Sequence, residues 1–93
     1  MSEQTLSLSD ATALAAILGW AQTNADVIWL NEAGVPTFGT ADFIGTMRGG
    51  MPSGTDDVRD CCLYLVTTDG QYVSLSMTDA IKRYRACEFM RNA

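Results

Sequence analysis

The acidic side chains of Asp56, Asp57 and Asp60 form the densest group of potential metal ligands in the sequence. Carboxylate oxygens are the ligands that Mg²⁺ and Ca²⁺ prefer. A calcium-binding loop, however, requires acidic residues at alternate positions followed by a glycine, and that spacing is absent here. We therefore interpret the three residues as the solvated end of a loop, and we expect neither a metal nor a cofactor. Their charge would instead attract a basic partner.

Nucleophilic catalysis and zinc binding have little support in this chain. It contains three cysteines, Cys61, Cys62 and Cys87, which form no Cys-x-x-Cys pattern, and it contains no histidine. The missing histidine removes the commonest general base and the usual partner of a catalytic serine or cysteine. We expect the cysteines to be small hydrophobic residues in a reducing cytoplasm. The sequence predicts no catalytic residue, so the protein is not expected to be an enzyme.

A glycine-rich segment, residues 49–57, has some features of a phosphate-binding loop. A phosphate-binding loop needs a lysine before its threonine and a helix after it. Here Gly54 stands directly before Thr55, and a strand is predicted to follow. We therefore predict a mobile connecting loop over residues 49–57 and a flexible segment over residues 1–6.

The charge balance restricts the class of partner. Eleven acidic residues against six basic ones give a net charge of −5, whereas nucleic-acid binding requires a basic footprint. Direct binding to nucleic acid is therefore not expected. Three of the basic residues, Lys82, Arg83 and Arg85, lie on one turn of the last predicted helix. They either complement the helix dipole or form a basic patch for an acidic partner or a second copy of the chain.

The sequence shows no targeting signal or membrane span, which predicts a cytoplasmic protein. The first residues are polar and acidic, unlike a signal peptide. The most apolar stretch, residues 11–18, is shorter than the roughly 20 residues of a membrane span. We expect one cytoplasmic domain over residues 1–93 with no membrane association.

Local signals in the first half predict two helices and a hairpin. Ser7 can cap a helix that ends near Thr23, with Asn24 as a left-handed stop. Residues 27–30 form a strand, residues 31–34 a turn and residues 35–38 a short or edge strand, because Pro36 cannot donate to a sheet. Thr40 is expected to cap a short helix that continues to about Arg48.

The second half predicts a long hairpin and a final helix. Strands over residues 58–68 and 71–77 flank the two-residue turn signal Asp69-Gly70. The register that this turn sets places Tyr64 and Val66 on the core side and leaves Leu63 and Leu65 on the reverse side. The last helix begins after Thr78, with Ala80, Ile81, Tyr84 and Cys87 on its inner face.

Together these elements predict an α+β domain. The expected architecture is one antiparallel sheet of about four strands, built from two hairpins, with helices packed on one face. The expected order is helix, strand, strand, helix, strand, strand, helix. Leu63 and Leu65 then have no cover from the chain, and Trp20 lies off the apolar stripe of the first helix, as an interface residue would.

These features favour a non-enzymatic binding protein that occludes or inhibits a macromolecular partner, such as a basic nucleic-acid-binding protein or complex. In size, charge and composition the chain is similar to the small acidic inhibitors of phages and mobile elements, including anti-CRISPR proteins. The alternative is a structural or regulatory homodimer. The residues expected to contact the partner are Trp20, Asp56, Asp57, Asp60, Leu63, Leu65, Lys82, Arg83 and Arg85.

Overall fold

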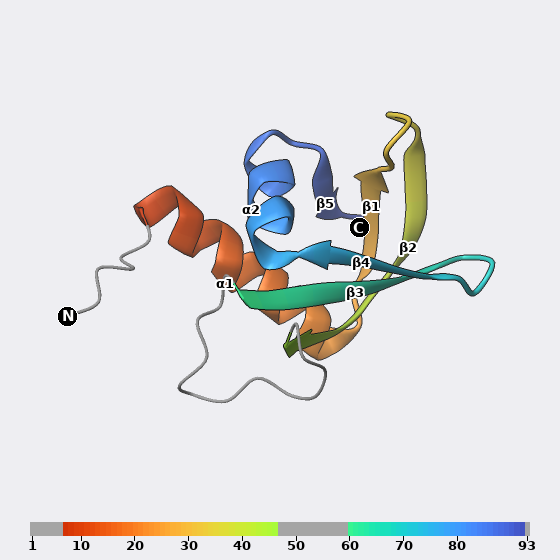
Figure 1. The fold of residues 1–93 in the computed structure, drawn as a ribbon, viewed down its shortest axis with the longest axis horizontal. Coiled ribbons are helices and arrows are strands. Elements are labelled where there is room, and N and C mark those ends of the chain that lie inside the picture. Colours follow the sequence, from red (N-terminus) through yellow and green to blue (C-terminus); the bar gives the residue numbers. More distant parts are fainter. Residues whose placement is uncertain (1–6, 47–59, 93) are drawn as a thin grey trace.

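A computed structural model describes residues 7–46 and 60–92 (Figure 1). Its elements are α1 (Leu8–Thr23), β1 (Asp26–Leu30), β2 (Pro36–Thr46), β3 (Cys61–Thr67), β4 (Tyr72–Ser76), α2 (Met77–Arg85) and β5 (Phe89–Arg91). Within this part of the chain, five antiparallel strands form one sheet in the order β4-β3-β2-β1-β5. The predicted α+β class with an antiparallel sheet is confirmed. In Figure 1 the strands of the β1–β2 hairpin run across the direction of the strands of the β3–β4 hairpin.

Both ends of α1 agree with the sequence prediction. The Ser7 hydroxyl accepts a hydrogen bond of 3.1 Å from the backbone N–H of Asp10. Asn24 has a left-handed φ of 51° and ends the helix, which is a backbone conformation that asparagine tolerates. The side-chain amide of Asn24 also donates to the carbonyl oxygens of Ala41 at 3.2 Å and Asp42 at 2.9 Å. The helix end therefore anchors the middle of β2.

Strand β2 corrects two predictions. The helix expected from Thr40 to about Arg48 is wrong over residues 40–46, which belong to a strand that pairs with β3, whereas residues 47 and 48 lie outside the described residues. The strand is also neither short nor at an edge, since it lies between β1 and β3. Pro36 is its first residue, where a missing N–H is tolerated. A β-bulge between Ala41 and Phe43 interrupts the pairing with β3.

The loop of the β3–β4 hairpin has three residues rather than two. The N–H of Thr67 donates to the carbonyl of Gln71 at 2.8 Å, and the N–H of Gly70 donates to the carbonyl of Thr67 at 2.9 Å. Gly70 has a φ of +89°, whereas Asp69 has no positive φ, which the predicted type I′ turn would require. A three-residue loop with glycine in the left-handed position explains this geometry.

The extra loop residue moves the register by one. Leu63 pairs with Leu75 and Leu65 with Val73, in place of the predicted pairs Tyr64–Leu75 and Val66–Val73. Because strand side chains alternate with a period of two, this shift exchanges the two faces of β3 while Val73 and Leu75 of β4 keep their core side. Leu63 and Leu65 are fully buried. The prediction that they form an uncovered strip is therefore wrong.

The core lies between the helices and one face of the sheet. Both helices contribute to one buried cluster, together with alternate residues of the strands. Its members are Ala13, Ile17, Ala21, Val27, Trp29, Ala41, Leu63, Leu65, Met77, Ala80, Ile81 and Phe89. The strand members lie on the same side of the sheet by their pairing. Among the described residues, no helix packs against the opposite side of the sheet as part of this cluster.

Helix α2 begins earlier than predicted. Ser76, not Thr78, is its N-cap, and the Ser76 hydroxyl accepts a hydrogen bond of 3.1 Å from the N–H of Asp79. Cys87 lies exposed beyond the helix end rather than on the inner face. The chain then adds β5, which the sequence analysis missed, beside β1. No helix in the described ranges is long and apolar enough to cross a membrane.

Candidate functional site

The side of the sheet opposite the helices carries a row of aromatic and aliphatic side chains that we call the open face. Strand alternation and pairing place its members together: Met90 lies opposite Ile28, and Ile28 opposite Phe38. Farther along the sheet, Val66 pairs with Tyr72 and Phe43 with Tyr64. The open face thus consists of Ile28, Phe38, Phe43, Tyr64, Val66, Tyr72 and Met90.

Four of these side chains are unusually accessible for their type. Phe38 is 47% exposed, Phe43 42%, Tyr72 68% and Met90 43%. In the described part of the chain only Leu8 and Val35 are other large hydrophobic residues with comparable exposure. Monomeric soluble proteins rarely expose large contiguous apolar patches, and such patches mark interaction sites.

At one end of the open face two aromatic rings are stacked on each other. The rings of Phe43 and Tyr64 stack with centroids 4.6 Å apart and an angle of 19° between their planes. Both residues are held by the pairing of β2 with β3. An aromatic pair fixed by its strands loses little conformational entropy when a partner binds, which favours affinity.

The charges near the open face are acidic. Asp26 pairs with Thr40, and Thr40 with Val66, so Asp26 lies on the open side of the sheet. Arg91 pairs with Val27, which belongs to the buried side. The remaining cations of the described residues, Lys82, Arg83 and Arg85, lie on α2. Within the described ranges, the open side of the sheet therefore presents a carboxylate and no cation.

Three predicted contact residues have a role in packing. Leu63 and Leu65 are core residues, as the register shift requires. Trp20 is half-buried against the core, with its ring 5.2 Å from that of Phe89 in an edge-to-face contact and 5.6 Å from that of Tyr84. Its departure from the stripe of α1 is explained by this contact with α2 and β5. A contact of Trp20 with a partner stays a prediction.

Two of the predicted basic contacts are engaged within the chain. Arg83 forms an ion pair of 2.9 Å with Asp79 and donates to the carbonyl of Leu30 at 2.5 Å. Arg85 forms an ion pair of 2.9 Å with Asp10 on α1. Lys82 is exposed. The arginines therefore attach α2 to its neighbours, and a partner role for the three residues stays a prediction.

Of the predicted acidic and cysteine residues, the structure describes Asp60 and the three cysteines. Asp56, Asp57 and the predicted loop at 49–57 lie outside the described residues, as do residues 1–6, whereas Asp60 is exposed just before β3. Cys61 is buried, Cys62 half-buried and Cys87 exposed. Across residues 7–46 and 60–92, no three histidine, cysteine or carboxylate side chains form a group that could hold a metal.

The sequence pattern does not predict the open face, because the two-residue turn that it favours places Tyr64 and Val66 in the core. The available signal was the aromatic content of the strand segments, Phe38, Phe43, Tyr64 and Tyr72. Placing these residues on one face requires both the three-residue loop at Gly70 and the bulge before Phe43. Neither feature has a unique local signature.

No protein-family model, curated protein or solved structure matches this chain. Its function must therefore be inferred from its own surfaces.

Proposed function

We propose that this protein is a non-catalytic binding protein whose open face docks on a protein partner with a basic rim. The observation that carries the proposal is the exposure of Phe38, Phe43, Tyr72 and Met90 on one side of the sheet. Aromatic residues and methionine are enriched in the centres of protein interfaces. Covering these side chains would remove apolar surface from water, which is the main driving force of association.

The charge of this surface favours a protein partner over a nucleic acid. Aromatic residues on an open sheet can also stack on the bases of single strands, but such sites include cations that contact the phosphates. Asp26 lies on the open side, and the whole chain has a net charge of −5. A polyanion would be repelled, whereas a basic protein surface would be steered toward the open face.

The same charge disfavours a symmetric pair formed through the open face. Two copies would bring their Asp26 carboxylates onto the same interface and combine two chains of −5 each. A heterologous partner with basic residues around an apolar centre avoids this repulsion. A small binder of this kind acts by occlusion, since covering a functional surface of the partner requires no catalytic group.

The test is a capture experiment with matched variants. The wild-type protein, immobilised and exposed to lysate of its source cells, is expected to retain one basic protein at low salt and to release it as the salt concentration rises. Phe38→Ser and Tyr72→Ser are expected to abolish capture. Leu8→Ser is the control, because Leu8 is 84% exposed but lies at the start of α1.

Two outcomes would contradict the proposal. The first is capture that the open-face variants leave unchanged and Leu8→Ser removes. The second is a stable dimer in light scattering that Phe38→Ser dissociates, which would assign the open face to a second copy of the chain. If a purified partner binds with the same affinity after its basic residues are neutralised, the proposed attraction between basic partner residues and this acidic protein is wrong.

A further inference from the structure

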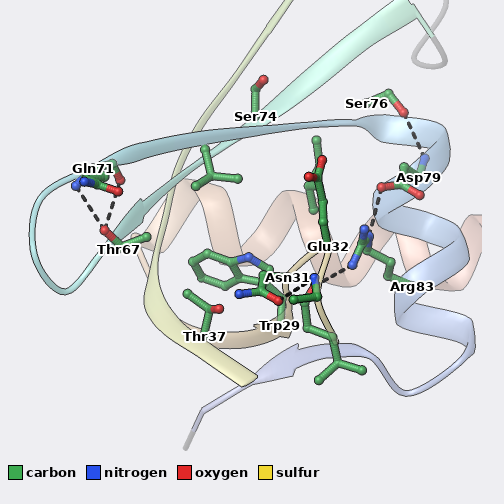
Figure 2. Close-up of a pocket in the computed structure, with 14 residues that line it drawn as sticks. Trp29, Asn31, Glu32, Thr37, Thr67, Gln71, Ser74, Ser76, Asp79 and Arg83 are labelled. Atoms are coloured by element: carbon green, nitrogen blue, oxygen red, sulfur yellow. Dashed lines mark hydrogen bonds and ion pairs between the residues drawn. The ribbon is translucent and has the colours of Figure 1, made fainter. Parts of the chain in front are cut away.

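A groove lies beside β4 on the side of the sheet that faces the helices (Figure 2). Its volume is about 710 Å³. Val73 and Leu75 of β4 line one side, and the β1–β2 turn with Arg83 of α2 lines the other. Trp29 lies between them in Figure 2. The groove combines an apolar lining with polar groups at its rim, as binding sites commonly do.

The backbone of β4 borders this groove with a free hydrogen-bonding edge. β4 is the first strand in the sheet order. Because the N–H of Thr67 bonds to Gln71 and hydrogen-bonded pairs recur at every second position, Val73 and Leu75 bond to β3. The N–H and C=O groups of Tyr72 and Ser74 therefore face away from β3.

This edge has none of the usual protection against another strand. Natural edge strands carry charged residues or prolines, or they are very short. β4 has the sequence Tyr-Val-Ser-Leu-Ser, with five residues and no charge or proline. The opposite edge strand, β5, has only three residues and includes Arg91. The difference singles out β4 as the edge that can accept a strand.

Among the described residues, the groove holds one carboxylate that has no ion-pair partner. Arg83 is paired with Asp79 at 2.9 Å. Glu32 extends from the β1–β2 turn into the groove (Figure 2). Glu32 makes no hydrogen bond or ion pair within residues 7–46 and 60–92. A basic side chain in the groove would therefore meet an available carboxylate.

We infer that β4 and this groove bind an extended basic segment of a protein partner by strand addition. Its backbone bonds to the outward groups of Tyr72 and Ser74, which supplies affinity that does not depend on sequence. Of its groove-facing side chains, one apolar residue packs against Val73 and Leu75, and a lysine or arginine pairs with Glu32. A second copy of β4 fits less well, because that strand offers no basic residue. This site shares β4 with the open face but uses the backbone edge and the core side of that strand, and it goes beyond the proposed function.

The test uses a synthetic probe and the intact protein. The probe is the blocked peptide Thr-Leu-Thr-Lys-Thr-Leu-Thr, whose leucines and lysine share one face when it is extended. Titrated to millimolar concentration into ¹⁵N-labelled protein, it is expected to shift the Ser74 amide and the Trp29 indole signals in a saturable manner. Methylating alternate backbone nitrogens of the probe is expected to abolish binding, because the strand pairing is lost.

The electrostatic part is tested on the protein side. Glu32→Gln is expected to weaken probe binding about two- to fivefold, as is usual for a partly exposed ion pair. Glu88→Gln is the matched control, since Glu88 is exposed and does not line this groove. A probe with glutamine in place of lysine is expected to bind more weakly to the wild type and to lose its sensitivity to Glu32→Gln.

Four results would overturn the inference. One is the absence of any shift at millimolar probe, and another is equal binding of the methylated probe. The third is a shift of the β4 amides with protein concentration alone, which would assign the edge to a second copy. Shifts confined to Phe38 and Met90 would reject the groove while leaving the open face as a docking surface. Loss of capture in Phe38→Ser with normal probe binding would support both sites independently, because Phe38 lies on β2 and not on β4.

Discussion

Phe43 stacks on Tyr64 because a β-bulge turns Phe43 to the open side of the sheet. Ala41 faces the core, and regular alternation would place Phe43 on the same side as Ala41. The bulge adds one residue between them, so Phe43 lies opposite Tyr64 and Ile44 lies opposite Leu63. The hydrogen bonds from the Asn24 amide hold the two carbonyls at this bulge. One backbone irregularity thus determines which of two adjacent hydrophobic residues is exposed.

Truncating these two neighbours is expected to affect stability and binding in opposite ways. Phe43→Ala removes the stacked pair and should lower the free energy of unfolding by only about 0.5–1.5 kcal/mol while abolishing partner capture. Ile44→Ala removes a residue packed against the core and should cost about 2 kcal/mol with capture retained. Urea denaturation measures both. A larger loss for Phe43→Ala than for Ile44→Ala would contradict the orientation set by the bulge.

Charge substitutions on the two faces of the β3–β4 hairpin should separate folding from binding. Leu65→Asp buries a carboxylate among apolar side chains and is expected to cost more than about 4 kcal/mol, which unfolds a domain of this size. Tyr72→Asp changes a 68% exposed side chain and is expected to leave the protein folded. Circular dichroism distinguishes the two outcomes. A folded Leu65→Asp protein would show that Leu65 is exposed, as the register of the predicted two-residue turn requires.

Two glycine substitutions are expected to have opposite signs. A Cβ atom at Gly39 would overlap the carbonyl oxygen of Val66 and lie 2.9 Å from the Trp29 ring. Gly39→Ala should therefore destabilise the protein by about 1–3 kcal/mol. A Cβ at Gly19 meets no atom within 4 Å, and Gly19 lies within α1. Gly19→Ala should stabilise by about 0.5–1 kcal/mol, since alanine is the better helix former. A lower melting temperature for Gly19→Ala as well as for Gly39→Ala would contradict the conclusion that a side chain fits at Gly19.

Cys87 occupies a backbone position that favours glycine. Its φ is +60°, and the N–H of Glu88 bonds to the carbonyl of Arg83 at 2.8 Å, which is the pattern of a helix C-terminal Schellman motif. Cys87→Gly is expected to raise stability by about 0.5–1 kcal/mol because glycine adopts this conformation without strain. Cys87→Ala keeps the strain and serves as the control, with little change expected in the denaturation midpoint. Equal midpoints for the two variants would show that the strain is not significant.

Features with a local cause were predictable from the sequence. Helix α1 begins after Ser7 and ends before Asn24, and both caps act through contacts within a few residues. The turn at residues 31–34 contains Gly34, which has a φ of +77°. Gly70 was placed correctly in the hairpin loop, because a positive φ there follows from the residue type. The sequence likewise sufficed for the α+β class, since helical and strand periodicities are short-range properties.

The tertiary structure decided which surfaces are available. Thr40 and the residues after it satisfy a local helix signal, yet pairing with β1 and β3 makes them a strand, because long-range hydrogen bonds and burial outweigh propensity. Three residues at Phe89–Arg91 become a strand only beside β1. Most of all, one residue more in the hairpin loop buried Leu63 and Leu65 and moved Tyr64 and Val66 to the side of Tyr72. Side chains alternate with a period of two, so a difference of one residue, invisible in the pattern itself, exchanges the core for the binding surface.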